Sequence, residues 1–157
     1  MKIAFGVDPG GFCLREGVLA HLKEKGWEVS DLGTQDMDHA VPYMLVGERV
    51  AQEVTSGKAD FGVVMCATGM GISIATNKNK GARCALCESY YTARESRIIN
   101  DANILALGGT TASLRMACEM IDVFVETPFG QGLPEFRVAR IRSGAANLAA
   151  FEDRKFK

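Results

Sequence analysis

The sequence predicts an α/β fold with a parallel β-sheet between two layers of helices. Short apolar runs typical of strands alternate along the chain with segments in which apolar residues recur at helical spacing. Strands separated by helices of about 10–15 residues are typical of parallel sheets covered on both faces. The chain has 157 residues, 47% of them apolar, which suits one compact domain with a sizeable core. We therefore expect a three-layer α/β/α sandwich around a Rossmann-like, five-stranded parallel sheet.

The first half of the chain is expected to supply three strands and two helices. Each strand is a short run rich in apolar residues, and the first of them ends at the turn residues Pro9 and Gly10. In both helices the apolar residues fall on one face, and Gly26 ends the first helix. We expect the strands at 3–7, 27–32 and 61–65, and the helices at 12–25 and 42–56.

The second half continues the alternation. A short helix is expected after the third strand, through Thr76, and the segment 128–133 is expected to break the pattern. The remaining strands are expected at 82–87 and 104–107, and the remaining helices at 89–100, 112–125 and 134–141. Residues 143–157 are less periodic, and we expect them to form a C-terminal extension to a single domain at 1–142, suited to contact a partner.

The segment 63–73 carries the most informative motif. An apolar run ends at Cys66, and Gly69 and Gly71 then open the expected short helix. Successive backbone N–H groups in such a loop can point at one anion, helped by the helix macrodipole. The same surroundings stabilise a cysteine thiolate, so the loop favours a reactive Cys66 over a thiol that only fills the core. Thr68 is a candidate to orient a ligand oxygen, and threonine is also a common helix N-cap.

Several polar or reactive residues fall where the expected strands end. Asp8 follows the first strand, Cys66 and Thr68 follow the third, and the turn 108–110 follows the fifth. In open parallel sheets, ligands bind beyond the carboxyl ends of the strands, near the point where the strand order reverses. We therefore expect one site at this edge. Asp8 is equally typical of a turn-forming residue before proline and glycine.

Composition argues against several classes of partner and cofactor. A net charge of −1 gives no electrostatic reason to expect nucleic acid or an anionic membrane surface. Five cysteines, an odd number, favour free thiols in a reducing compartment, and so a cytoplasmic location. Cys84 and Cys87 have the spacing of a redox or zinc motif, but in a strand they would point to opposite faces and are expected to be core thiols. Two histidines and no clustered carboxylates give no metal site.

Ordered landmarks cover about residues 1–141. They are Lys2-Ile3-Ala4, Asp8, Gly11, Lys25-Gly26, Asp31-Leu32-Gly33-Thr34, Pro42-Tyr43, Cys66-Ala67-Thr68-Gly69-Met70-Gly71, Ala75-Thr76-Asn77-Lys78, Asn100-Asp101-Ala102-Asn103 and Leu105-Ala106-Leu107-Gly108. In these the chain resembles the type B ribose-5-phosphate isomerases and the galactose-6-phosphate isomerase subunits. The resemblance implies a three-layer α/β sandwich, a homodimer often paired into a homotetramer, and a site without metal or organic cofactor.

The resemblance also implies a chemistry. In that family a cysteine is the general base that moves a proton between C1 and C2 of a sugar through a cis-enediolate, which implies this role for Cys66. The charge of the enediolate would be held by Thr68, Gly69, Met70 and Gly71. The resemblance further implies sugar-hydroxyl contacts at Asp8, Tyr43 and Asn100 and a phosphate contact at Arg137.

The chain departs from the family pattern where substrate is prepared and anchored. Pro9 and Ile99 stand where family members carry histidines, the second of which opens the sugar ring. Leu133 stands in the basic cluster that grips phosphate, although Arg140 follows Arg137 by three residues. The leading interpretation is an aldose–ketose isomerase of a small sugar phosphate, by homology a pentose 5-phosphate such as ribose 5-phosphate. The alternatives are an isomerase of a linear tetrose phosphate or an unphosphorylated sugar, a non-catalytic sugar-binding subunit and, more weakly, a thiol-redox protein.

Overall fold

The computed structural model describes residues 1–156 and contains a five-stranded sheet in which every pairing is parallel. The strands are β1 (Lys2–Val7), β2 (Glu28–Asp31), β3 (Phe61–Cys66), β4 (Cys84–Leu86) and β5 (Ile104–Gly108), in the order β2-β1-β3-β5-β4. β1, β3 and β5 form the centre of the sheet and are the most apolar strands, as expected for strands covered on both faces.

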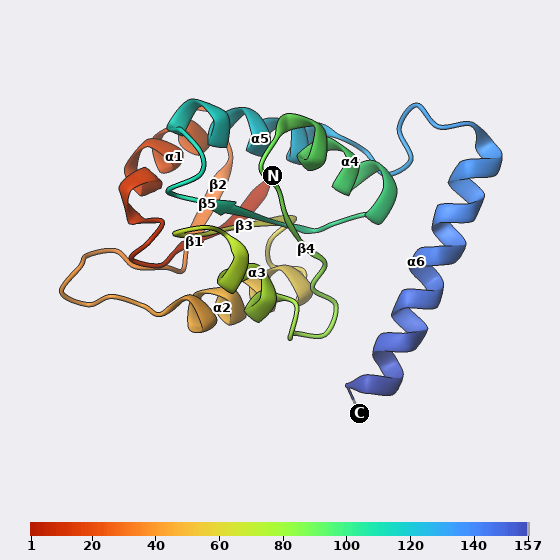
Figure 1. Cartoon of the computed structure of the whole chain (residues 1–157), viewed down its shortest axis with the longest axis horizontal. Helices are drawn as coiled ribbons and strands as arrows, with labels where there is room; N and C mark the ends of the chain where they lie inside the picture. The colour runs from red at the N-terminus through yellow and green to blue at the C-terminus, as the bar shows by residue number, and fades with distance from the viewer. Residues whose placement is uncertain (157) are drawn as a thin grey trace.

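Helices cover both faces of this sheet (Figure 1). One layer consists of α1 (Phe12–Glu24), α4 (Tyr90–Asn100) and α5 (Leu114–Glu126), and the other of α2 (Tyr43–Thr55) and α3 (Met70–Thr76). The expected three-layer sandwich and the positions of its five strands are therefore confirmed. The observed ends differ from the expected ones by no more than a few residues.

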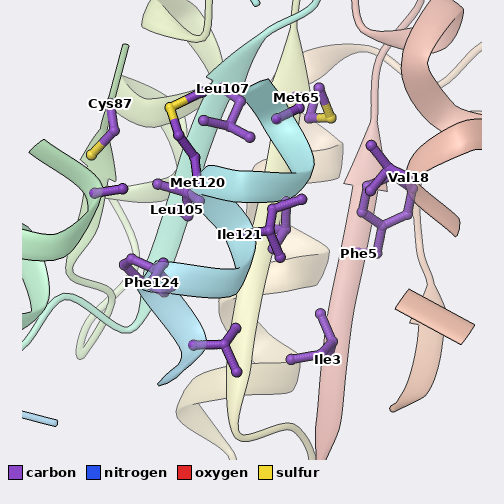
Figure 2. Close-up of a cluster of buried hydrophobic side chains, with 14 of the residues drawn as sticks. Ile3, Phe5, Val18, Met65, Cys87, Leu105, Leu107, Met120, Ile121 and Phe124 are labelled. Atoms are coloured by element: carbon purple, nitrogen blue, oxygen red, sulfur yellow. The ribbon is translucent and has the colours of Figure 1, made fainter. Parts of the chain in front are cut away.

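Each face of the sheet has its own core. On one face, side chains of α5 such as Ile121 and Phe124 point onto Phe5, Met65 and Leu105 of the strands (Figure 2). On the other face, valines of α2 and Ile72 of α3 pack on the alternate residues of β1, β3 and β5. Burying each such side chain stabilises the fold by about 1.5–3 kcal/mol before the entropy cost of ordering it. The two cores hold the carboxyl ends of β1, β3 and β5 in fixed register.

The last helix is much longer than the sequence suggested. α6 runs from Glu135 to Lys155, so the expected end at 141 is wrong. Alanines at 145, 146, 149 and 150 favour helix without producing an apolar stripe, which is why a search for periodicity missed the continuation. The boundary between a domain at 1–142 and an extension at 143–157 stays a prediction, and Lys157 lies outside the described residues.

α6 stands beside the body of the molecule, with none of its residues buried (Figure 1). Near its carboxyl end, Glu152 accepts a hydrogen bond from the Gly81 N–H at 2.8 Å, and Asp153 pairs with Lys80 at 2.8 Å. Among residues 1–156, no helix combines the length and apolar character needed to cross a bilayer. The cytoplasmic location stays a prediction.

Candidate active site

The candidate site lies where the strand order reverses. Successive strands are added on one side of β1 and then on the other, so the carboxyl ends of β1 and β3 flank the switch point. Asp8 follows β1, and Cys66 is the last residue of β3. The Asp8 N–H donates to the Met65 carbonyl at 3.0 Å, which holds the two strand ends side by side. The expected convergence of Asp8 and Cys66 at this edge is thus observed.

The Cys66 sulfur is enclosed by its own loop. The residue is 6% exposed, and the Gly69 N–H donates to Cys66 Sγ across 3.1 Å. Gly69 has a φ of +77°, and a Cβ there would lie 2.5 Å from Leu86 Cδ1 and 2.9 Å from the Leu107 carbonyl carbon. Both the dihedral angle and the space therefore require glycine. The backbone can turn tightly enough to aim an amide at the sulfur only because this side chain is absent.

Thr68 and the start of α3 complete the loop. Gly69, rather than Thr68, occupies the N-cap position, and the Thr68 hydroxyl accepts a long contact of 3.4 Å from the Met70 N–H. α3 has seven residues, so its macrodipole is small, and an anion bound here would be held by individual N–H groups. The N–H groups of Gly71 and Ile72 in its first turn have no carbonyl four residues back within the helix. They are available to an oxygen of a ligand.

The turn after β5 fixes the other side of this loop. The Gly109 N–H donates to the Cys66 carbonyl at 2.8 Å. Thr110 donates to the Ala67 carbonyl both from its N–H at 2.9 Å and from its hydroxyl at 2.6 Å. The sequence marked this turn only by its place at a strand end. The role of the Thr110 hydroxyl had no sequence signal, because it joins residues 43 positions apart.

Asp8 fits both interpretations that the sequence left open. One carboxylate oxygen, Oδ1, accepts from the Gly10 N–H at 2.8 Å and the Gly11 N–H at 3.1 Å, so Asp8 does form the turn. A Cβ on Gly10 would lie 2.5 Å from the Ala67 nitrogen, so this turn packs directly on the cysteine loop. In the described part of the chain, Oδ2 has no hydrogen bond and is left for a ligand hydroxyl.

Tyr43 reaches the same site from α2, the helix that shares a layer with α3. It is the first residue of α2, and a Cβ on Gly71 would lie 3.4 Å from Cε2 of its ring. The ring therefore covers the start of α3 while Tyr43 stays 39% exposed. Met70, between the two glycines, is 53% exposed on the same helix. Asp8, Tyr43 and the Cys66–Gly71 loop thus form one group of site residues within the chain.

Asn100 and Arg137 each lie apart from Cys66. Asn100 ends α4, and the Asn103 carbonyl that follows accepts from Gly62 near the beginning of β3. Asn100 is therefore at the amino edge of the sheet. Cys66 lies four residues beyond Gly62, so about 13 Å of strand separates Gly62 from Cys66. Arg137 is exposed on the first turn of α6. One copy of the chain does not bring these two residues to Cys66.

A groove of about 520 Å³ separates α6 from the body. Asn100 lines it together with residues of β4 and the alanine-rich face of α6, and Cys66 does not. The lining combines apolar side chains with the polar groups of Arg83 and Asp101. This groove is therefore distinct from the candidate site around Cys66.

Cys84 and Cys87 are thiols of the two cores. Cys84 packs with the α2/α3 side of the sheet and Cys87 with the opposite side, as their strand position predicts. Burial raises the pKa of the Cys84 thiol to about 12 and also raises the pKa of Cys87. Both remain protonated thiols near neutral pH, which argues against the thiol-redox alternative. Within the described residues, no three histidine, cysteine or acidic side chains gather closely enough to hold a metal ion.

Comparison with known proteins decides the family. The family model for the Ribose/Galactose Isomerase family matches residues 3–141. The chain belongs to this family. Ribose-5-phosphate isomerase B of Escherichia coli K12 is 40% identical over 140 residues, covering 89% of this chain and 93% of the relative. The chain is thus a member of a sugar-phosphate isomerase family, and the expectation of an isomerase is confirmed.

A second relative extends the range of substrates in the family. The 4-deoxy-4-sulfo-D-erythrose isomerase of Clostridium sp. MSTE9 is 39% identical over 153 residues, covering 98% of this chain and 96% of the relative. Among solved structures, ribose-5-phosphate isomerase B of Clostridium thermocellum superposes with a TM-score of 0.89 at 40% identity, with 99% of each chain covered. Both similarities include the segment of α6 beyond residue 141.

Proposed function

We propose that this protein is an aldose–ketose isomerase in which Cys66 is the general base. The observation that carries the proposal is the position of the Cys66 sulfur. It ends a central strand at the switch point of the sheet, beside backbone N–H groups that begin a helix. A proton acceptor and donors for a developing oxyanion are the two groups that enolisation requires. Membership of the isomerase family supports the same reaction.

The proposed reaction only moves protons and electron pairs within the substrate, so it needs no further reactant. Cys66 takes the proton from C2 of the open-chain aldose, the C1=C2 double bond forms, and the negative charge moves to O1. The N–H groups of Gly71 and Ile72 and the hydroxyl of Thr68 hold this enediolate. Cys66 returns its proton to C1 while the O2 hydroxyl proton passes to O1, which leaves a C2 ketone. Asp8 and Tyr43, which lie over the same loop, would hold the remaining hydroxyls.

The chain favours a linear four-carbon acid over a pentose phosphate as the substrate. Ring opening of a furanose needs an acid–base group, and Ile99 offers an exposed apolar side chain where the family pattern places a histidine. A tetrose with phosphate or sulfonate on C4 has no C4 hydroxyl with which to close a furanose. The relative from Clostridium sp. named for a sulfo-tetrose, which this chain matches over 98% of its length, supports the same choice.

The test is hydrogen exchange in D₂O across a substrate panel. The panel contains ribose 5-phosphate, erythrose 4-phosphate, 4-deoxy-4-sulfoerythrose, ribose and erythrose, and NMR follows deuterium at C1 and C2. We expect the two C4 acids to exchange fastest. Faster exchange with ribose 5-phosphate would overturn the choice of substrate but not the reaction. Sugar binding without exchange, or exchange only after addition of a related chain, would instead support the non-catalytic subunit.

We further propose that a second copy of the chain completes the site. The two copies form a homodimer, and two such dimers can pair into a homotetramer. Two observations support this: Asn100 and Arg137 lie away from Cys66, and the helix that follows Cys66 exposes Met70 (53%) and Ile74 (61%). An isologous pair would cover these side chains on both copies. It would also bring Asn100 and Arg137 of each copy to Cys66 of the other.

Complementation tests the shared site. Cys66→Ser removes the base and Asn100→Ala weakens sugar binding, so at a sugar concentration well below the wild-type KM each variant alone is expected to have little activity. If sites are shared, co-expression produces mixed dimers with one intact site, and about a quarter of the wild-type activity returns when copies pair at random. Activity no higher than the mean of the two variants would contradict a shared site.

A further inference from the structure

The segment Asn100–Asn103 is held far more firmly than an exposed helix end requires. Asn103 donates from Nδ2 to the Gly81 carbonyl at 2.9 Å and accepts from the Arg83 N–H at 2.8 Å. Ala102 is buried. Unlike Asp101 and Asn103, Asn100 makes no side-chain hydrogen bond to another of the residues 1–156, and it lines the groove beside α6. Residues 101–103 are thus fixed by the rest of the chain, and they hold the backbone next to Asn100.

Asp101 has the most constrained position in this segment. It is the one non-glycine residue of the described chain with positive φ, at φ 48° and ψ 42°, and it caps the end of α4. Its two carboxylate oxygens receive different arginines: Arg97 donates to Oδ1 at 2.7 Å and Arg83 to Oδ2 at 3.1 Å. Arg83 also donates from Nε to the Asp101 carbonyl at 2.7 Å. Backbone strain of this kind persists only where the surroundings fix it.

Arg97 connects the segment 101–103 to the core. It is 7% exposed, and its guanidinium lies 4.8 Å from the centre of the Phe61 ring and 5.7 Å from that of Phe124. It also donates to the Ala102 carbonyl at 2.7 Å. A charge buried this deeply needs a counter-ion, and Asp101 supplies it. The position of Asp101 is therefore tied to the aromatic core under α4 and α5.

We infer that Asp101 is a positioning residue for substrate binding: held between Arg97 and Arg83, it fixes the direction in which Asn100 presents its amide. The inference rests on the proposed function, in which Asn100 holds a substrate hydroxyl. The amide must be oriented before substrate arrives, because ordering it during binding would weaken affinity.

A double-mutant cycle on KM tests this role. Asp101→Gly keeps the left-handed backbone accessible and removes the two arginine contacts of the carboxylate, while the backbone carbonyl that accepts from Arg83 remains. We expect it to raise KM about tenfold while kcat changes less than about twofold, and to raise KM no further when Asn100 is already alanine. Asp101→Asn, which keeps a hydrogen-bonding side chain, should recover part of the affinity.

A second variant covers the case in which Asp101→Gly leaves Arg97 without its counter-ion and fails to fold. Arg83→Met removes the partly exposed arginine from Asp101 without stranding a buried charge, and should also raise KM only when Asn100 is present. Arg115→Met is the matched control, because it removes an arginine that pairs with Glu119 on the exposed face of α5. Circular dichroism confirms the fold of each variant.

The outcomes separate this inference from the proposed function. Wild-type exchange together with a KM effect that vanishes in the Asn100→Ala background supports positioning. Wild-type exchange with independent, multiplicative effects of Asp101 and Asn100 on KM, or with no KM effect in either Asp101→Gly or Arg83→Met, overturns it and leaves the isomerase intact. No exchange with any member of the sugar panel overturns both.

Discussion

Replacing Gly69 by alanine is the sharpest structural test of the cysteine loop. At a φ of +77°, a Cβ costs about 1–2 kcal/mol because it crowds its own backbone. The new methyl group would also lie 2.5 Å from Leu86 Cδ1 and 2.9 Å from the Leu107 carbonyl carbon. The Leu86 side chain can rotate, but the backbone of β5 cannot move without disturbing the sheet. Such overpacking adds about 1–3 kcal/mol.

The chain contains a matched control. Gly26 has a φ of +74°, and a Cβ there would meet nothing within 4 Å. Gly26→Ala should therefore lower the free energy of unfolding by only the backbone cost, about 1–2 kcal/mol. Gly69→Ala should lower it by about 2–5 kcal/mol, the sum of the backbone cost and the overpacking cost. The difference between the two variants isolates the steric cost at the site.

Urea unfolding at equal protein concentration measures this difference. Equal concentration matters because association with a second copy would shift apparent stability. Gly69→Ala should also lose isomerase activity, since the displaced N–H no longer points at Cys66 Sγ, whereas Gly26→Ala should keep it. The reasoning is refuted if the two variants unfold at the same urea concentration, or if Gly69→Ala is as active as Gly26→Ala.

Three further changes test other parts of the structure. Ser89→Ala removes a reciprocal cap, in which Ser89 and Thr92 accept each other's backbone N–H at 3.1 and 3.2 Å, and should lower the unfolding free energy by about 1 kcal/mol in urea. Leu105→Ala, in a fully buried position of β5, should lower it by about 2–5 kcal/mol, and a smaller loss would mean that the core collapses into the space. Burial raises the pKa of Cys84 from 9.0 to about 12. Between these pH values the unfolded chain has lost a proton that the folded chain keeps. The free energy of unfolding therefore falls as pH rises, by about 1 kcal/mol per pH unit. Urea unfolding at pH 8 and pH 10 should therefore show a larger loss for wild type than for Cys84→Ala, and equal losses would contradict that burial.

The sequence predicted the fold well because the central elements carry periodic apolar patterns. β1, β3 and β5 are the strands with the most buried residues, and their positions were found to within two residues at either end. The meeting of Asp8 and Cys66 followed from the same pattern, since parallel strands place their carboxyl ends at one edge.

Features that depend on distant residues had no such signal. No pattern in the sequence singled out Arg97, and its burial depends on Phe61 and Phe124, which lie far from it in the chain. The length of α6 was missed because helix propensity, not periodicity, sustains it. The resemblance joined Asn100 and Arg137 to one site with Cys66, but sequence motifs carry no distances, and a single copy keeps them apart.

The rate of C2 hydrogen exchange in the Cys66→Ser variant tests the central claim most directly. Serine is a similarly small side chain that can still accept from the Gly69 N–H, but it is a much weaker base at neutral pH. At saturating sugar, exchange should fall at least about 100-fold, the usual contribution of a general base, while circular dichroism shows an unchanged fold. Cys118→Ser, on α5 and away from the site, should exchange like wild type. Exchange by Cys66→Ser within about threefold of wild type would contradict a role for Cys66 as the base.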